Sequence, residues 1–406
     1  MSDLIAHRLR DLLGEASVEQ TADQLPRALP ESTEAVAAVC AAAHAAGWRL
    51  RVEGHGSWLP ADAPADLVLS TAALDKVARI AAADLVATAQ AGVTMSRLAA
   101  ALAAEGTWLA LDPPGRPDRT LGSVVATGTA GPLRHRFGAV RDQVVGCTLV
   151  TTDGRIVPAG GRVTKNVAGY DLVKLMVGGF GAFGIVTEVH LRLRALPAAD
   201  LTLLATGERD PLTLLARELE AARLDAAAVE LLSPAVAAGP AWALAVRLAG
   251  HRAAVEAEAL RARELAAGAG WQSIEGDRGA SFWQGVARAM AGEPVSLRFG
   301  VLAEGLDETL DLLRQRLDLG RVSAGAARGG LRWSGVTDLA TLREVRHLLA
   351  TREIPVTVER APWGLRHATG HFGAYREGVG SLVAELRRRF DPSGLIQVAL
   401  DGSEGD

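Results

Sequence analysis

The sequence feature that most constrains the fold is the glycine-rich segment Gly179-Phe180-Gly181-Ala182-Phe183-Gly184. Its letters match G-x-G-x-x-G, the fingerprint of dinucleotide-binding folds, which requires a strand before the motif and a helix after it. Here the order is reversed, because residues 171–177 have helical apolar spacing and residues 185–194 alternate as a half-buried strand does. A Rossmann-type NAD site is therefore rejected at this segment, and its glycines need another explanation.

The first of two further glycine-rich segments is Gly54-His55-Gly56-Ser57. It follows a short strand signal at 49–52, which itself follows a helix expected to begin at Ser32 or Thr33 and to end at Gly47. Successive backbone N–H groups in such a turn can face inward and cradle an anion such as pyrophosphate. A tight turn without a ligand is the alternative interpretation of this segment taken alone.

The second further segment is 120–131, which is rich in glycine, alanine and threonine and follows the stiff, proline-containing stretch 111–115. Small residues allow a ligand or another backbone to approach closely. The alternative is a helix packed through its glycine and alanine residues. A single extended ligand that touches all three glycine-rich segments is the simplest common explanation.

Residues 165–174 concentrate side chains that are rare in the rest of the sequence. Only three lysines, one asparagine and two tyrosines occur in 406 residues, and this segment holds Lys165, Asn166, Tyr170 and Lys174. Two interpretations remain open. Either these residues are retained for specific chemistry at a ligand, or they begin a helix that Asn166 caps.

The length of 406 residues is long for one hydrophobic core and predicts two domains. Before residue 197 the strand signals include a hairpin at Asp153-Gly154, where both central residues are expected to take positive φ. After it, helices rich in Ala, Leu, Arg and Glu alternate with short apolar strands, which indicates an α+β fold. We expect an N-terminal helix at 1–23, a first domain at 24–197, a smaller second α+β domain at 198–360, and a C-terminal segment at 361–406 that contains a helix and packs back on the first domain.

Composition argues against several classes of protein. The formal net charge is −4 with mixed signs, and aromatic residues make up 4%, so neither a basic surface nor stacking platforms for nucleic acid are expected. The two cysteines, Cys40 and Cys147, are too few to hold an iron-sulfur cluster and lack zinc-site spacing. Residues 1–13 resemble an amphipathic helix and not a signal peptide, and no apolar run is long enough to span a bilayer. We expect a cytoplasmic protein that reaches the inner membrane, if at all, through partners.

Residues 30–197 resemble the flavin domain of the FAD-linked oxidases of the vanillyl-alcohol-oxidase or p-cresol-methylhydroxylase (PCMH) type. Within that group the segment around Lys165 is the most specific, because it is similar to the FAD-binding subunits of bacterial glycolate oxidases and to their catalytic relatives. The segments that carry the resemblance are 54–57, 111–114, 120–122, 138–142, 160–171, 181–188 and the terminal 390–394.

The resemblance implies a PCMH-type FAD-binding domain of two α+β subdomains with FAD between them. The pyrophosphate would be held by backbone N–H groups of residues 54–57 and 120–123, and the strand that begins at Ile185 would lie along the cofactor. The residues expected to bind FAD are Gly54, His55, Gly56, Ser57, Pro113, Thr120, Leu121, Gly122, Ser123, Arg141, Lys165, Asn166, Gly181, Gly184, Ile185 and Val186.

The resemblance also implies an activity, the oxidation of glycolate to glyoxylate. Electrons would pass via FAD to an iron-sulfur partner subunit, beside a separate catalytic flavoprotein subunit. Two alternatives remain open: a stand-alone FAD-linked oxidoreductase acting on another 2-hydroxy acid or a sugar, and a structural subunit that has lost the cofactor.

No catalytic residue or metal ligand is assigned from the sequence. Catalytic relatives carry a histidine-rich motif with Gly-Asp-Gly-Asn, which this sequence lacks. Its nearest counterparts are His367 and His371, which we interpret as surface or loop histidines. The triplet Arg134-His135-Arg136 is interpreted either as a contact for a carboxylate or a partner protein, or as a solvated face.

Overall fold

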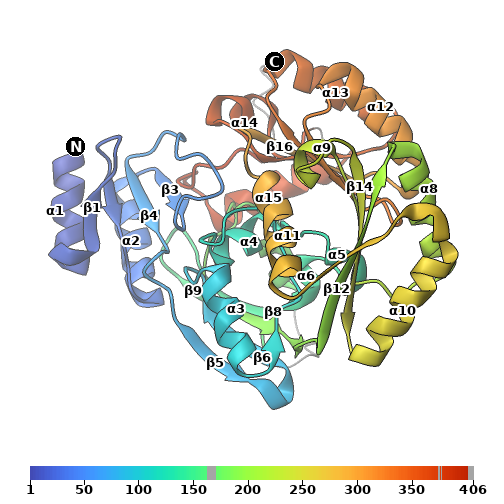
Figure 1. Cartoon of the computed structure of the whole chain (residues 1–406). Coiled ribbons are helices and arrows are strands. Elements are labelled where there is room, and N and C mark those ends of the chain that lie inside the picture. The colour runs from blue at the N-terminus through green and yellow to red at the C-terminus, as the bar shows by residue number, and fades with distance from the viewer. Residues whose placement is uncertain (162–170, 374, 376, 401–406) are drawn as a thin grey trace.

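The computed structural model describes residues 1–161, 171–373, 375 and 377–400, and it has an α+β fold, as predicted (Figure 1). The predicted site residues Lys165 and Asn166 lie outside the described residues. Within the described part, the strands form sheets of four, five and eight strands and one two-stranded ribbon. No helix in that part is long and apolar enough to cross a membrane.

The four-stranded sheet is built from the N-terminal residues and has the order β1-β2-β4-β3. Its strands are β1 Val18–Gln20, β2 Pro26–Ala28, β3 Leu50–Glu53 and β4 Leu67–Ser70. Helices α1 (Ser2–Leu13) and α2 (Thr33–Ala46) bury their apolar faces in the same core as these strands. The Oγ of Ser32 caps α2 by accepting from the N–H of Ala35, and Gly47 ends the helix at φ 68°, so both predicted boundaries are confirmed.

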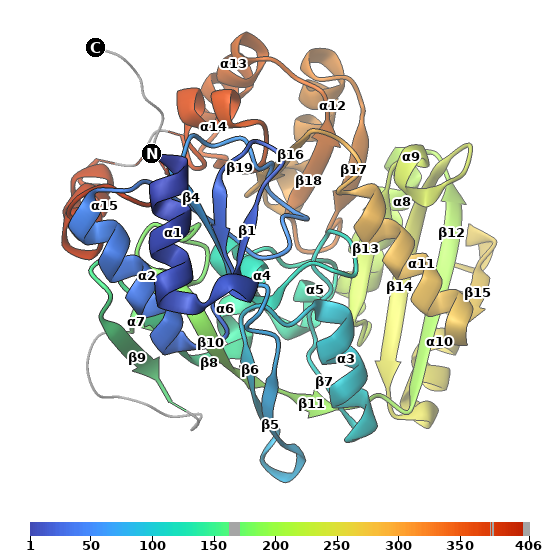
Figure 2. The ribbon, with the colours of Figure 1, turned by 90° about the vertical axis from the view of Figure 1, so that its left-hand side faces the viewer.

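The five-stranded sheet is antiparallel, with β10 at its centre in the order β5-β6-β10-β8-β9. Its strands are β5 Val77–Ala81, β6 Val86–Gln90, β8 Val144–Val150, β9 Ile156–Gly160 and β10 Ile185–Arg192. Beside it lie the ribbon β7 (Thr107–Trp108) with β11 (Arg194–Ala195) and the helices α3 Met95–Ala104, α4 Leu121–Thr127, α5 Arg134–Phe137, α6 Val140–Gln143 and α7 Leu172–Met176 (Figure 2). Helix α7 directly before and β10 directly after the 179–184 segment confirm the reversed order of elements around its glycines.

The hairpin between β8 and β9 is present, but its turn differs from the predicted one. The N–H of Thr151 donates to the carbonyl of Arg155 at 3.0 Å, so the turn is longer than two residues. Gly154 takes positive φ, at 85°, whereas Asp153 does not. A longer turn needs positive φ at fewer positions, and the carboxylate of Asp153 instead accepts from the hydroxyl of Thr151.

The eight-stranded sheet is antiparallel and has the order β15-β12-β14-β13-β17-β18-β16-β19. Its strands are β12 Ala199–Gly207, β13 Ala228–Leu232, β14 Trp242–Gly250, β15 Gln272–Glu275, β16 Val295–Phe299, β17 Arg321–Ala324, β18 Leu331–Gly335 and β19 Val356–Arg360. The helices α8 Arg209–Ala221, α10 Arg252–Leu265, α12 Leu306–Arg316 and α13 Leu339–Ala350 share the hydrophobic core of one of its faces. The opposite face turns toward the other two sheets, with α9 (Pro234–Ala237) and α11 (Gly276–Ala289) packed at one side of it (Figure 1).

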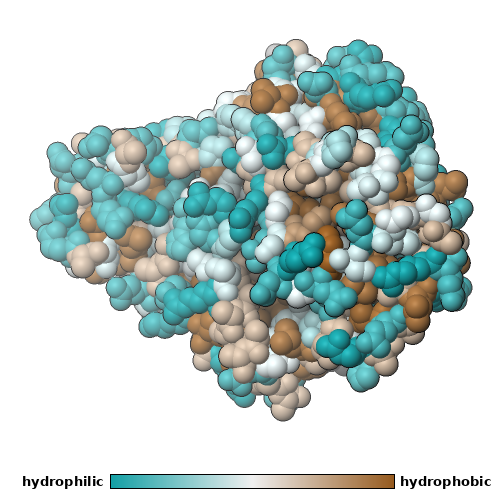
Figure 3. Space-filling view, in the orientation of Figure 1, coloured by the Kyte–Doolittle hydropathy of each residue, from teal (hydrophilic) through white to brown (hydrophobic). Residues whose placement is uncertain are grey.

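In this part of the chain, the periodic patterns predict helices at 211–224, 253–267 and 306–317, and these are present as α8, α10 and α12. The patterns did not predict α11 or α13. The N-terminal helix α1, which we assigned to a separate segment, contributes Ile5 and Leu9 to the core of the residues that follow it. On the face drawn in Figure 3, the N-terminal end is mostly hydrophilic, and hydrophobic residues show in the middle and toward the eight-stranded sheet.

The C-terminal segment returns to the four-stranded sheet. After α14 (Trp363–Thr369) and α15 (Val379–Phe390), the carbonyl of Leu395 accepts from the N–H of Leu50 at 2.8 Å, and the N–H of Gln397 donates back to Leu50 at 3.0 Å. The carboxylate of Asp391 holds this return in place by accepting from the N–H groups of Leu395 and Ile396. Residues almost 350 positions apart in sequence therefore lie side by side.

His371 lies in this returning part and corrects our interpretation of it as a surface or loop histidine. Its side chain is fully buried and stacks on the ring of Phe180, with centroids 3.7 Å apart. Burial lowers the pKa of His371 to about 3, so the imidazole is neutral at physiological pH.

Replacing Leu395 by Ala tests how much stability the C-terminal return supplies. Leu395 is 3% exposed, so Leu395→Ala is expected to lower the free energy of unfolding by about 2–5 kcal/mol through lost burial and a residual cavity. Leu382→Ala is the matched control, because Leu382 is 59% exposed on α15. Chemical denaturation measures both variants. Equal stability of the two would mean that the return contributes little to the core.

Candidate cofactor cavity and arginine pocket

The three glycine-rich segments meet at one cavity with about 1190 Å³ of empty space, including its open mouth. One wall is the loop 54–60 after β3, and a second is α4 with the residue before it. The segment 179–186 and the C-terminal residues 396–398 close the remaining sides. We call this the cofactor cavity. Its walls come from the three glycine-rich segments in the first half of the chain and from the C-terminal return.

Some of the glycines are required by the packing of the protein against itself. A Cβ on Gly54 would lie 2.3 Å from the Oγ1 of Thr120, and one on Gly122 would lie 2.9 Å from the carbonyl of Ala91. Gly54 thus lets the first loop touch the start of α4, and Gly122 lets α4 touch the loop after β6. Gly181 differs from both, because it has φ +82° and open space around the position of its absent side chain.

The free backbone donors lie on the first loop and not at the start of α4. The N–H groups of Leu121 and Gly122 donate to Val93 and Ala91 at 2.9 and 2.7 Å, and that of Ser123 donates to the Oγ1 of Thr120. Contrary to our expectation, these three groups are not available to a pyrophosphate. In the described part of the chain, no hydrogen bond uses the N–H groups of residues 55–57 as donors. Of the N–H groups compared, those of residues 55–57 are therefore the ones left without an acceptor in the described part of the chain.

Eleven of the sixteen predicted residues line the cofactor cavity: Gly54, His55, Gly56, Ser57, Thr120, Gly122, Ser123, Gly181, Gly184, Ile185 and Val186. Leu121 does not, since it is fully buried in the core on the inner side of α4. Pro113 lines a different cavity, and Arg141 is exposed on α6, whose inward side is taken by Val140 and Gln143.

Sequence reasoning missed several side chains of the cavity wall. Trp58 follows the first loop and is 3% exposed, and Arg366 reaches the cavity from α14 while it pairs with Asp62 at 2.9 Å. Phe180, which stacks on His371, stands inside the glycine-rich segment that we examined only for its glycines. The signal for Phe180 in the sequence is its place as an aromatic residue between two glycines.

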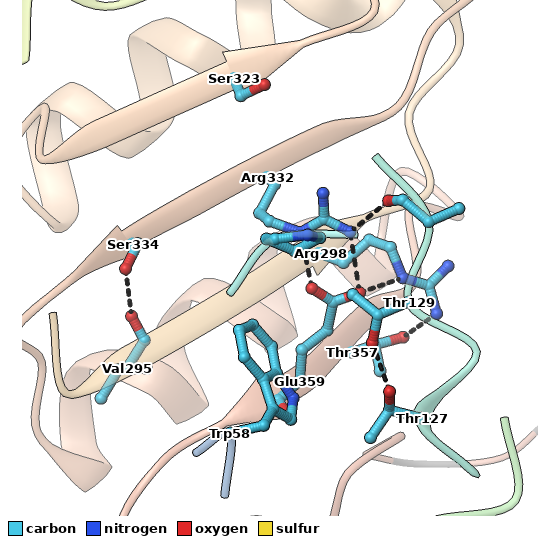
Figure 4. Close-up of polar contacts among 12 residues, drawn as sticks. Trp58, Thr127, Thr129, Val295, Arg298, Ser323, Arg332, Ser334, Thr357 and Glu359 are labelled. Atoms are coloured by element: carbon cyan, nitrogen blue, oxygen red, sulfur yellow. Dashed lines mark hydrogen bonds and ion pairs between the residues drawn. The ribbon is translucent and has the colours of Figure 1, made fainter. Parts of the chain in front are cut away.

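A buried ion cluster adjoins the cofactor cavity on the side of the eight-stranded sheet. The carboxylate of Glu359 is fully buried, and it accepts from Arg332 at 2.6 and 3.1 Å and from Arg298 at 2.9 Å (Figure 4). Burial by itself would raise the pKa of Glu359, but the charges and hydrogen bonds of the two guanidinium groups outweigh it and hold the pKa below its usual value. Glu359 is therefore ionised at neutral pH.

Trp58 and Arg119 connect this cluster to the cofactor cavity. The indole N–H of Trp58 donates to the backbone carbonyl of Glu359 at 3.2 Å, and the guanidinium of Arg119 lies 3.9 Å from the Trp58 ring centroid. Arg119 also donates to Ser123 and Thr127, which line the cavity. Burial lowers the pKa of Arg119 to about 9, so its charge persists at neutral pH. The two side chains form a wall between the cavity and the sheet.

A second, smaller cavity, with about 640 Å³ of empty space including its open mouth, lies between α5 and the centre of the eight-stranded sheet. We call it the arginine pocket, and its lining residues are Ala130, Gly131, Pro132, Arg134, His135, Glu230, Arg298, Ser323, Gly325, Arg328, Gly329, Gly330, Leu331 and Arg332. Burial raises the pKa of Glu230 to about 7, and the hydroxyl of Ser323 donates to its carboxylate at 2.5 Å.

The triplet 134–136 is exposed at its two arginines and nearly buried at its histidine. Arg134 lines the arginine pocket, His135 is nearly buried, and Arg136 turns away to pair with Asp225 at 2.9 Å. Burial lowers the pKa of His135 to about 4, so this histidine is neutral at physiological pH. Within the described residues, no group of three or more His, Cys, Asp and Glu side chains is arranged to hold a metal ion.

Replacing Glu359 by Gln tests the ion cluster. Glu359→Gln removes the charge that compensates Arg332 and Arg298, so we expect a loss of about 3–5 kcal/mol in the free energy of unfolding. Glu385→Gln removes a carboxylate of the same type from the surface of α15 and is expected to leave the free energy of unfolding nearly unchanged. Denaturant titration distinguishes the two. A Glu359→Gln protein as stable as its control would show that the buried pair is not needed for folding.

Comparisons with known proteins also indicate an FAD binding domain in the first half of the chain. A family model described as an FAD binding domain matches residues 27–160. The glycolate oxidase subunit GlcE of Escherichia coli (strain K12) is 43% identical over 121 residues, which are 30% of this chain and 35% of that protein. The glycolate oxidase subunit GlcD of Bacillus subtilis (strain 168) is 34% identical over 167 residues, which are 41% of this chain and 36% of that protein.

The matched part of the chain thus spans about a third of the length of each of these relatives. A crystal structure of p-cresol methylhydroxylase with substrate bound superposes over 100% of this chain and 98% of the other, with a TM-score of 0.77 and 13% sequence identity, which is a likeness of fold. Residues 27–160 thus match an FAD binding domain, and the chain is similar in sequence to glycolate oxidase subunits and in fold to p-cresol methylhydroxylase.

Proposed function

We propose that this chain is the FAD-binding subunit of a glycolate oxidase. In this proposal, FAD in the cofactor cavity takes part in the oxidation of glycolate to glyoxylate and passes electrons to an iron-sulfur partner subunit. The observation that carries it is the convergence of three glycine-rich segments on one cavity, inside a domain that an FAD-binding family model matches. Relatives named glycolate oxidase subunits support the substrate and the multi-subunit assembly.

The residues of the cavity fit an FAD molecule. The free N–H groups of residues 55–57 are suited to a pyrophosphate, because converging backbone donors bind anions without a counter-charge. Apolar side chains at the other walls, including Met176, Phe183 and Ile185, suit the faces of an aromatic ring system. When bound, FAD supplies the two-electron acceptor, and the chain's own contribution is to hold it and to exclude water.

Among the residues that the structure describes, no base for the substrate is assigned. The sequence lacks the histidine-rich motif of catalytic relatives, and the buried His371 is committed to Phe180 and to the carbonyl of Val358. We therefore assign proton abstraction to a partner flavoprotein subunit. The D-lactate dehydrogenase of Archaeoglobus fulgidus, 33% identical over 180 residues, keeps another 2-hydroxy acid among the candidate substrates.

Gly54→Ala tests whether the cofactor cavity holds FAD. The added methyl group would overlap Thr120 and push the first loop away from α4, so we expect the purified variant to lose most of its flavin absorbance near 450 nm while its circular dichroism stays unchanged. Gly285→Ala in α11 is the control, because its methyl group would meet no atom within 4 Å. Full flavin content in Gly54→Ala would contradict this site. A wild-type protein that stays colourless after FAD is supplied would favour the cofactor-less alternative.

Anaerobic mixing with glycolate tests the division of labour. We expect glycolate to leave the flavin of the isolated chain oxidised, and to bleach it when the chain is co-purified with its partner subunits. Bleaching of the isolated chain, together with reduction of an artificial dye, would instead support a stand-alone oxidoreductase. The same experiment with D-lactate shows which 2-hydroxy acid is preferred.

A further inference from the structure

We propose that His371 is a positioning residue for the cofactor: from behind Phe180, it holds the Phe180 ring as a wall of the cofactor cavity against which a planar ring of the cofactor packs. Phe180 lines the cavity, whereas His371 does not. This role rests on the proposed function, since it needs FAD in the cofactor cavity. The flavin ring and the adenine of FAD are both planar, and a second ligand distinguishes them in the test.

The first observation is the backbone conformation of Phe180. Its φ is +52°, in the left-handed region that a bulky residue rarely adopts, although a glycine stands on each side of it. Its N–H donates to the carbonyl of Ala126 in α4 at 2.7 Å, which fixes the residue beside that helix. Such conformations persist where the surrounding structure compensates for them, and they are concentrated at binding sites. The ring of Phe180 therefore needs a compensating contact.

That contact is the stack on His371. The two ring centroids are 3.7 Å apart and the planes are inclined by 18°, so the imidazole covers one face of the phenyl ring. Phe372 adds a T-shaped contact with centroids 5.5 Å apart. Because Phe180 also lines the cofactor cavity, the part of its ring that these two residues leave uncovered is available to a ligand.

His371 is itself held from two sides. Its Nδ1 lies 2.6 Å from the carbonyl of Val358, and the N–H of Val358 donates to the carbonyl of His371 at 2.7 Å. The N–H of His371 donates to the carbonyl of Ala399 at 2.9 Å. Val358 directly precedes Glu359, so the imidazole is anchored both beside the buried ion cluster and in the C-terminal return. A ring held in this way resists displacement when a ligand packs on Phe180.

The flat ring of His371 carries this role, and its charge does not. Nδ1 donates to the Val358 carbonyl, which can only accept, so Nε2 carries no proton in the neutral imidazole. In the described part of the chain, Nε2 is buried without a hydrogen-bond partner. A phenyl ring at position 371 would keep the stack and remove this unpaired acceptor. An amide at the same position would keep a donor and remove the stack.

Binding of FAD to the full chain, freed of flavin and followed by flavin fluorescence, tests this role. We expect His371→Phe to bind within about threefold of wild type, and His371→Gln and Phe180→Leu to bind about tenfold more weakly. Phe282→Leu is the matched control for Phe180→Leu, because Phe282 packs on Trp283 in α11 and does not line the cofactor cavity. Its affinity is expected to match that of wild type. Affinity is measured on folded protein well below the unfolding temperature, where a residue that only stabilises the fold would leave it unchanged.

Competition by ADP identifies the ring that packs on Phe180, because ADP contains the adenine and the pyrophosphate but no flavin. If that ring is adenine, Phe180→Leu weakens ADP and FAD equally. If it is the flavin, Phe180→Leu weakens FAD and leaves the affinity for ADP as in wild type.

Three results would overturn this role alone, in a wild-type chain that binds FAD. They are wild-type affinity in both His371→Gln and Phe180→Leu, equal weakening in Phe180→Leu and Phe282→Leu, or a His371→Phe variant as weak as His371→Gln. A wild-type chain that binds no FAD would refute the proposed function as well. A chain that binds FAD but takes no part in glycolate oxidation would refute the proposed function and leave the role of His371 intact.

Discussion

The buried carboxylate of Glu359 is the interaction on which the arrangement of the two sites depends. Taking an ionised carboxylate out of water is costly, and the two guanidinium groups of Arg332 and Arg298 make it tolerable because they meet it with short, charge-assisted hydrogen bonds. Arg332 also donates to the carbonyl of Ala130, and the backbone of Glu359 receives the indole N–H of Trp58. One cluster thus ties the eight-stranded sheet to two walls that belong to the FAD binding domain.

This connection explains why the cofactor cavity needs the whole chain. The loop 54–60 follows the parallel strand β3, and Ile185 and Val186 at another wall begin β10, the central strand of the antiparallel sheet. The C-terminal residues 396–398 form the last wall. Each of these segments is short and would not hold its conformation in isolation. They are positioned by long-range contacts, such as the pairing of Leu50 with Ile396 and the packing of Gly54 against Thr120. The cavity is therefore a property of the assembled sheets and not of one motif.

How much could be predicted follows from the range of the interactions involved. Local signals were sufficient for the cap at Ser32, the stop at Gly47 and the helix-before-strand order around Gly181, because each depends on neighbours in sequence. The occupied N–H groups at the start of α4 could not be foreseen. Their acceptors, Ala91 and Val93, come from a loop about thirty residues earlier, and no pattern within α4 reveals that contact.

The arginine pocket could not be predicted from the sequence, for a related reason. Glu230, Arg298, Ser323, Arg332 and Glu359 occupy the same face of five separate strands, where a polar side chain at every second position ordinarily indicates a solvated face. The first sheets cover that face, and this is a tertiary fact that strand periodicity does not contain. Neither the burial of these side chains nor the pocket could therefore be inferred from alternation alone.

At particular positions of these sites there is also a physical reason for arginine. Only three of the 43 basic residues are lysine, which a compositional bias explains in general. At Arg119, however, one guanidinium donates to four separate oxygen acceptors while its plane lies over Trp58. Arg346 similarly donates to four backbone carbonyls near His371. An ammonium group has three donors and no planar face, so lysine could not replace either residue without leaving buried acceptors unpaired. At these two positions the fold requires arginine, the residue that the compositional bias also favours.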